Sequence, residues 1–134
     1  MTTYVDSSAL LKRYVAEPDS AVAERLILAD PVLVSSWITV VELRRNLARL
    51  VEADALPGVR RQCLRDLDEF ALVAVDEVVC NAAAAIGEQL GVRTLDAVHL
   101  ACAQRLQIPG LTFVTFDLRQ AQAARLLGFT VLGA

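Results

Sequence analysis

The stretches TYVDSS at residues 3–8 and FVTFD at residues 113–117 are short apolar runs that each lead into an aspartate. Both combine β-branched and aromatic residues over four or five positions before polar residues follow, which is typical of a buried strand. In a parallel α/β sheet, ligands bind in the crevice beyond the carboxyl ends of the strands. We therefore expect Asp6 and Asp117, about 110 residues apart in the sequence, to lie over one crevice and to hold a cation there.

The composition predicts one domain with an apolar excess. The chain has 134 residues, of which 55% are hydrophobic, and its mean hydropathy is +0.46. This length predicts a single domain over residues 1–134. A membrane-spanning helix needs about 20 consecutive apolar residues, and a charged residue interrupts every candidate stretch. We therefore expect no membrane association and attribute the apolar excess to a subunit or partner interface.

The N-terminus and the cysteines predict a protein of the reducing cytoplasm. Residues 1–6 contain no basic region of the kind that opens a secretory signal. The three cysteines are an odd number and lack CxxC spacing. Two of them, Cys80 and Cys102, fall within apolar helical patterns, and we expect both to be small buried side chains.

Basic residues gather in one part of a chain whose net charge is −3. Between residues 44 and 65 there are six arginines and only two acids. This arginine patch consists of Arg44, Arg45, Arg49, Arg60, Arg61 and Arg65. Because a phosphate responds to the local charge more than to the total, the patch indicates contact with a nucleic acid.

Strand-like and helix-like segments alternate along the chain. This order predicts a three-layer α/β/α fold with a central parallel sheet of about four to five strands and right-handed crossovers. Strands are expected at residues 2–6, 31–35, 71–75, 112–116 and 129–132. Helices are expected at about 8–15, 19–29, 38–54, 59–69, 77–90, 94–107 and 118–127. The helix pair between the second and third strands is too long for a plain crossover, so we expect it to protrude as a hairpin.

Two further acids are expected at the same edge of the sheet. Asp96 lies in the first turn of the helix that Thr94 is predicted to cap, and His99 shares its face. Glu42 lies on the helix at residues 38–54, on the face that continues into the arginine patch.

Each acid also has a purely structural interpretation. Asp6 and Asp117 can cap the helices that follow them, Asp96 suits the positive end of a helix dipole, and Glu42 can pair with a neighbouring arginine. Taken together, four carboxylates within about 5 Å would repel by roughly 3 kcal/mol per pair at an effective dielectric constant near 20. Protons or a cation must neutralise such a cluster. Ligation by oxygen alone favours Mg²⁺ or Mn²⁺.

Four segments, in this order, resemble the motifs of PIN-domain ribonucleases, and most closely those of VapC-type toxins of type II toxin–antitoxin pairs. They are YVDSS at residues 4–8, VEL at 41–43, LDAVHLA at 95–101 and VTFD at 114–117. The resemblance covers essentially the whole chain. It implies a PIN-like fold, a Mg²⁺- or Mn²⁺-dependent endoribonuclease, a homodimer, and a VapB-type antitoxin that covers the active-site groove. We expect a basic residue of that antitoxin to enter the carboxylates and to compete with the metal.

The resemblance also implies roles for individual residues. The catalytic and metal-binding quartet is Asp6, Glu42, Asp96 and Asp117. Thr115 carries over as a hydroxyl near the metal, and Ser7 does so more weakly. A metal held by the three aspartates would orient a water and lower its pKa for hydrolysis of an RNA phosphodiester bond. Some relatives carry a further acid after the fourth, whereas residues 118–127 contain none here, which leaves open whether one or two ions bind.

Basic residues near the quartet are expected to hold RNA phosphates. Arg45 and Arg49 share the helical face of Glu42, and phosphate contacts of this kind position RNA without reading its sequence. Lys12 and Arg13, one or two turns beyond Asp6, are predicted to do the same. His99 is a candidate general base, but a lone histidine beside an apolar stripe is more often structural, so its role stays open between the two.

Other families that open with a strand and an aspartate fit less well. A haloacid-dehalogenase-like phosphatase needs a second aspartate two residues after the first, where this chain has Ser8. A response-regulator receiver needs an acidic pair at the first strand, and a dinucleotide-binding domain needs glycines after it; both are missing. A PIN-like module that binds RNA or protein without cleavage stays open as the alternative function.

Overall fold

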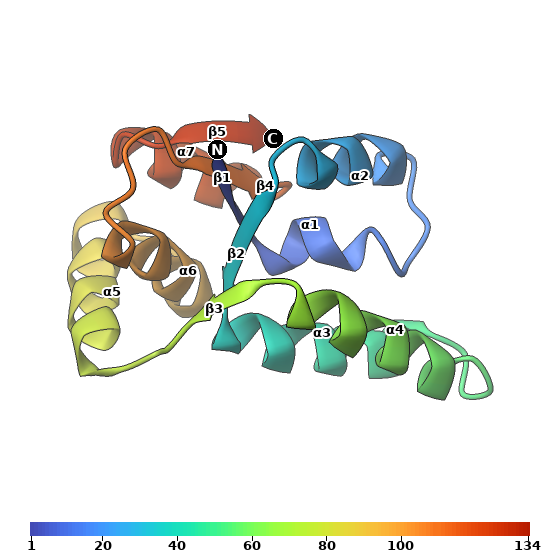
Figure 1. Ribbon diagram of the computed structural model, residues 1–134. Helices are drawn as coiled ribbons and strands as arrows, with labels where there is room; N and C mark the ends of the chain where they lie inside the picture. The colour runs from blue at the N-terminus through green and yellow to red at the C-terminus, as the bar shows by residue number, and fades with distance from the viewer.

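The five strands of the structure, a computed structural model that describes residues 1–134, form one parallel sheet (Figure 1). They are β1 (Thr2–Val5), β2 (Val32–Ser36), β3 (Ala71–Val73), β4 (Thr112–Thr115) and β5 (Thr130–Gly133). Their order in the sheet is β3-β2-β1-β4-β5. Strands β1 and β4, which are far apart in the sequence, are therefore neighbours at the centre.

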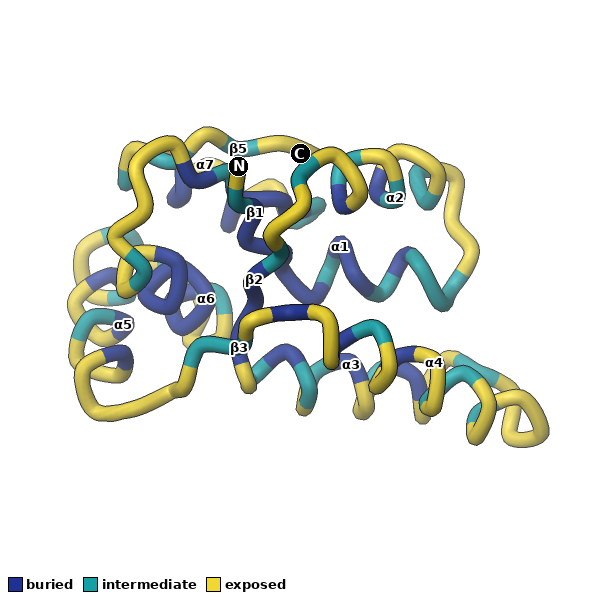
Figure 2. The backbone as a smooth tube through the Cα atoms, in the orientation of Figure 1, coloured by how far each residue is buried: buried dark blue, intermediate teal, exposed yellow.

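The two central strands are buried on both faces. Because strand side chains alternate between the faces, Tyr4 and Phe113 pack in one hydrophobic cluster, and Val5 and Val114 pack in the other. All four residues are fully buried, which is typical of parallel strands covered by helices on each side (Figure 2).

Seven helices cover the sheet and complete the predicted three-layer α/β/α fold. They are α1 (Ser7–Leu11), α2 (Ser20–Leu28), α3 (Trp37–Leu50), α4 (Leu56–Asp68), α5 (Glu77–Leu90), α6 (Thr94–Arg105) and α7 (Leu118–Leu126). Helices α5, α6 and α7 pack on the face of Tyr4, and α1 to α4 pack on the face of Val5. The prediction of the fold class is confirmed. No helix is both long and apolar enough to cross a membrane.

Helices α3 and α4 lie side by side and extend away from the sheet, as the predicted hairpin (Figure 1). Helix α3 begins directly after β2, because the Ser36 hydroxyl caps it by accepting a hydrogen bond from the backbone N–H of Ile38. Helix α4 begins at Leu56, earlier than predicted. Pro57 lies in its first turn, where its missing N–H would have no partner in any case.

Two local predictions were wrong. Thr94 is the first residue of α6 and not its cap; Arg93 occupies the cap position in an extended conformation and makes no capping hydrogen bond with its side chain. Cys80 is exposed, because α5 turns Val79, Ala83 and Ile86 toward the core. Cys102 is buried, as predicted.

Candidate functional site

The parallel pairing of β1 and β4 brings the two strand-ending aspartates to one edge of the sheet. Val5 lies opposite Val114, and the backbone N–H of Asp6 continues the pairing with a 2.9 Å hydrogen bond to the Val114 carbonyl. The Asp6 carboxylate then caps α1, where it accepts from the N–H of Ser8 at 3.0 Å. Asp117 caps α7 in the same way. The structural interpretation of both aspartates is therefore correct, and it is also what orients them at this edge.

Two cationic or proton-bearing side chains link the four predicted acids, Asp6, Glu42, Asp96 and Asp117, which we call the acid cluster. His99 Nε2 lies 2.5 Å from Glu42 Oε1 and 3.3 Å from Asp6 Oδ1. Arg93 Nε lies 3.5 Å from Asp96 Oδ2, and Arg93 Nη2 lies 3.0 Å from Asp117 Oδ2. The structure thus brings together residues of α3 and α6 and the cap residues of α1, α6 and α7, which span most of the sequence.

His99 is buried between the acid cluster and the core. Its side chain is 1% exposed, and its Nδ1 lies 2.8 Å from the hydroxyl of Tyr4, itself fully buried. Because a carboxylate only accepts hydrogen bonds, His99 Nε2 carries a proton and donates a hydrogen bond to Glu42. Burial lowers the pKa of His99, but the charges of Asp6 and Glu42 outweigh it and raise the pKa above the ordinary value. His99 therefore holds Glu42 in place and offsets negative charge beside it.

The surroundings of Asp96 disfavour its negative charge. Burial raises its pKa, and the carboxylates of Asp117 and Asp6 raise it further, whereas the Arg93 guanidinium lowers it. The net effect is a raised pKa, which means that the surroundings of Asp96 resist another negative charge. A cation at this position would remove that cost.

A hydroxyl and amide network supports Asp6 from the side of β4. Thr115 Oγ1 donates to Gln120 Oε1 at 2.7 Å and lies 3.4 Å from Asp6 Oδ2; Gln120 Nε2 lies 3.4 Å from Asp6 Oδ1. Ser8 joins this network, because its Oγ lies 3.3 Å from Thr115 Oγ1 and accepts from the backbone N–H of Phe116 at 3.0 Å. The role of Ser7 near a metal stays a prediction. Thr115 was predicted as a hydroxyl near the metal; it lies beside Asp6, and its relation to a metal stays a prediction.

Gln120 was missed in the sequence. It is fully buried, and it connects Thr115 with Asp6. The available signal was its spacing, because a capping residue followed three positions later by Gln or Glu is the capping-box pattern at a helix start. Here the Gln120 side chain turns inward to the acid cluster.

The acid cluster has the chemistry of a hard-metal site without a formed ligand set. Carboxylate oxygens suit Mg²⁺ or Mn²⁺, and the raised pKa of Asp96 favours a cation. Yet no three Asp, Glu, His or Cys side chains are arranged to hold a metal ion. Glu42 is engaged by His99, and Asp96 and Asp117 by Arg93. The residue types fit the metal, and the predicted ligand set stays a prediction.

The predicted RNA-binding residues fall into two groups. No arginine of the arginine patch lies within 4.0 Å of an acid, and Arg45 and Arg49 donate only to the side-chain oxygen of Asn46. Lys12 and Arg13 differ. Lys12 is buried and pairs with two acids at 2.7 and 2.8 Å, and Arg13 pairs with Glu24. Their charges are neutralised within the protein, so of the predicted RNA-binding residues only Arg45 and Arg49 are cations without an acidic partner.

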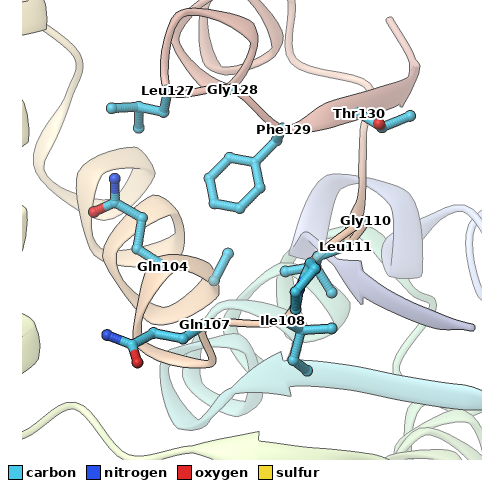
Figure 3. Close-up of a pocket in the computed structure, with 11 residues that line it drawn as sticks. Gln104, Gln107, Ile108, Gly110, Leu111, Leu127, Gly128, Phe129 and Thr130 are labelled. Atoms are coloured by element: carbon cyan, nitrogen blue, oxygen red, sulfur yellow. The ribbon is translucent and has the colours of Figure 1, made fainter.

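Two cavities differ in their relation to the acid cluster. A cavity of about 400 Å³ is lined by Glu42, Arg93, Thr94, Leu95 and Asp96. Figure 3 shows another, of about 340 Å³, where Gln104, Ile108 and Phe129 lie near the beginnings of β4 and β5. That second cavity is at the opposite edge of the sheet and has no charged residue in its lining. Of these two cavities, only the first is lined by residues of the acid cluster.

Comparisons with known proteins agree with this geometry. The sequence pattern of the PIN domain matches residues 3–126. Ribonuclease VapC46 of Mycobacterium tuberculosis is 37% identical over 129 residues, which cover 96% of this chain and 95% of the relative. Ribonuclease VapC47 of the same species is 31% identical over 126 residues, which cover 94% of this chain and 92% of the relative. A toxin–antitoxin complex from Klebsiella pneumoniae is similar in fold, with a TM-score of 0.73 over 97% of this chain and 95% of that chain at 17% identity.

Proposed function

This chain belongs to the PIN-domain family, among the VapC ribonucleases, and from that premise we propose that it is a metal-dependent endoribonuclease and the toxin of a VapBC-type toxin–antitoxin pair. The observation that carries the proposal is the acid cluster at the carboxyl ends of β1 and β4, together with an arginine patch without acidic partners that begins on the same helix as Glu42. A module that only binds RNA or protein has no need for buried, mutually repelling carboxylates.

The proposed reaction is hydrolysis of an RNA phosphodiester bond. Asp6, Asp96 and Asp117 would hold Mg²⁺ or Mn²⁺, which when bound supplies a Lewis acid and a water of lowered pKa. Glu42 faces the same cluster and is held there by His99, so its free oxygen can accept a proton from water. The arginine patch holds the phosphates that flank the cleaved bond.

The proposed partners are a VapB-type antitoxin and a second copy of this chain. Support comes from the outer face of α3, where Trp37 is 57% exposed and Val41 is 62% exposed, next to Glu42. Large apolar side chains exposed beside a charged site are typical of a surface that a partner covers. The proposal includes a cytoplasmic location, and the three cysteines are free, as a reducing compartment requires.

The proposed activity is tested by incubating the purified protein with total RNA. Cleavage is expected with Mg²⁺ or Mn²⁺ and is expected to stop when EDTA removes the ion, because carboxylates alone cannot stabilise the charge of the transition state. RNA fragments are measured on a denaturing gel. Binding of RNA without fragments at saturating Mn²⁺ would favour the non-cleaving alternative.

Arg45→Ala and Arg49→Ala are each expected to weaken RNA binding and to flatten its salt dependence. One lost phosphate contact reduces the slope of log K against log salt by about 0.7 for a single strand. Binding is measured in the Asp96→Asn background, so that the RNA stays intact. Arg25→Ala removes an exposed charge from α2 and is the matched control, with an unchanged slope expected. Equal slopes in all the variants would place the RNA elsewhere.

A further inference from the structure

Arg93 is a cation of this chain that already lies within the acid cluster. Its guanidinium bridges Asp96 and Asp117 at 3.5 and 3.0 Å, from a position just before α6. These two carboxylates come from different helices, 21 positions apart in the sequence, and the structure shows no other basic group within 4.0 Å of either. Arg93 therefore occupies the place where a cation is most needed.

The ion pairs of Arg93 with Asp96 and Asp117 are weak, although there are two of them. Its side chain is 71% exposed, and it makes no capping hydrogen bond to α6. An ion pair open to water is screened, and the long side chain loses freedom when it pairs. Arg93 also lines two cavities beside the cluster. One is the cavity of about 400 Å³ lined by Glu42, Leu95 and Asp96, and the other is a neighbouring cavity of about 310 Å³. It can leave its carboxylates without disturbing the fold.

We infer that Arg93 is an exchangeable counter-ion, which pairs with Asp96 and Asp117 in the metal-free protein and turns to a phosphate of the RNA when a divalent cation binds these carboxylates. The inference rests on the proposed function and adds a residue to its substrate contacts. A guanidinium suits both states, because its fork of N–H donors matches a carboxylate and a phosphate equally well.

The arrangement of the acids supports this exchange. Asp96 and Asp117 do not form a ready ligand set, and both point an oxygen at Arg93. The other half of the cluster differs, since Glu42 and Asp6 are held by the buried His99, which has no room to leave. Arg93 is exposed and loosely held, so a metal ion can displace it. His99 is buried and fixed, so it stays in place when the metal binds.

The first measurement is Mn²⁺ binding by calorimetry, without RNA. Arg93→Ala is expected to bind Mn²⁺ roughly two- to tenfold more tightly than the wild type, because no internal cation then competes. Arg119→Ala is the control. Arg119 lines the same neighbouring cavity and carries the same charge but has no acid within 4.0 Å, so its loss should change the affinity by less than about twofold.

The second measurement is cleavage of an RNA oligonucleotide at saturating Mn²⁺. Arg93→Ala is expected to raise KM several-fold, with a smaller effect on kcat, whereas Arg119→Ala is expected to leave both near the wild type. Wild-type Mn²⁺ affinity in Arg93→Ala, or a wild-type KM, would overturn the inference while the ribonuclease assignment stands. A wild-type protein that neither binds Mn²⁺ nor cleaves RNA would remove the proposed function, and the inference with it.

Discussion

Replacing Asp96 with Asn is expected to abolish RNA cleavage and to remove most of the thermal stabilisation by Mg²⁺ or Mn²⁺. In the wild type, a hundredfold excess of metal over Kd should stabilise the fold by about 2.7 kcal/mol. The amide is neutral and a poorer ligand for a hard cation than the carboxylate. Thermal unfolding with and without metal, together with the RNA assay, measures both effects.

The metal-free Asp96→Asn variant should be at least as stable as the wild type. Folding raises the pKa of Asp96, which means that the folded state disfavours its ionised form. The charge that Asp96 carries at neutral pH therefore lowers the stability of the fold. Asp76→Asn is the control: Asp76 caps α5 and pairs with the half-exposed Arg105, with no ion pair to His99 or Arg93, and Asn caps as well as Asp does. A normal metal response in Asp96→Asn would contradict the assigned ligand set.

Replacing His99 with Leu is expected to lower both stability and activity. The hydroxyl of Tyr4 is fully buried and would lose its 2.8 Å partner, which costs about 1 to 3 kcal/mol. Glu42 would lose the side chain that orients it, so the cleavage rate should fall even where the protein is folded. Urea unfolding gives the first effect, and the rate at saturating metal gives the second.

A second substitution separates the two effects. Adding Tyr4→Phe to His99→Leu removes the stranded hydroxyl and should recover the part of the lost stability that comes from Tyr4, since replacing both partners of a buried hydrogen bond by apolar groups is nearly neutral. The part that comes from Asp6 and Glu42, which lose the charge of His99, should not return. Activity should not return, because Glu42 still lacks its donor. Recovery of activity with stability in the double variant would show that His99 acts only through the fold.

Local sequence patterns predicted much of the architecture. The apolar runs ending in Asp6 and Asp117 were recognisable as buried strands from their β-branched and aromatic residues, and their position in the chain indicated a parallel sheet. Helix limits were less accurate. Capping depends on side-chain orientation, so Arg93 could not be recognised as the residue before α6. Helix α4 was predicted to begin after Pro57, whereas Pro57 lies within its first turn.

The sequence by itself determined the set of acids, their placement after strands or early in helices, and the family to which the chain belongs. Only the tertiary structure decided how their charges are arranged. It gave Glu42 and Asp6 a buried histidine, gave Asp96 and Asp117 an exposed arginine, and turned Gln120 inward. It also paired Lys12 and Arg13 with acids, so that their charges are not free to bind phosphate. Spacing along the chain indicates which face a side chain occupies, whereas its charge partner depends on the packing of segments far apart in the sequence.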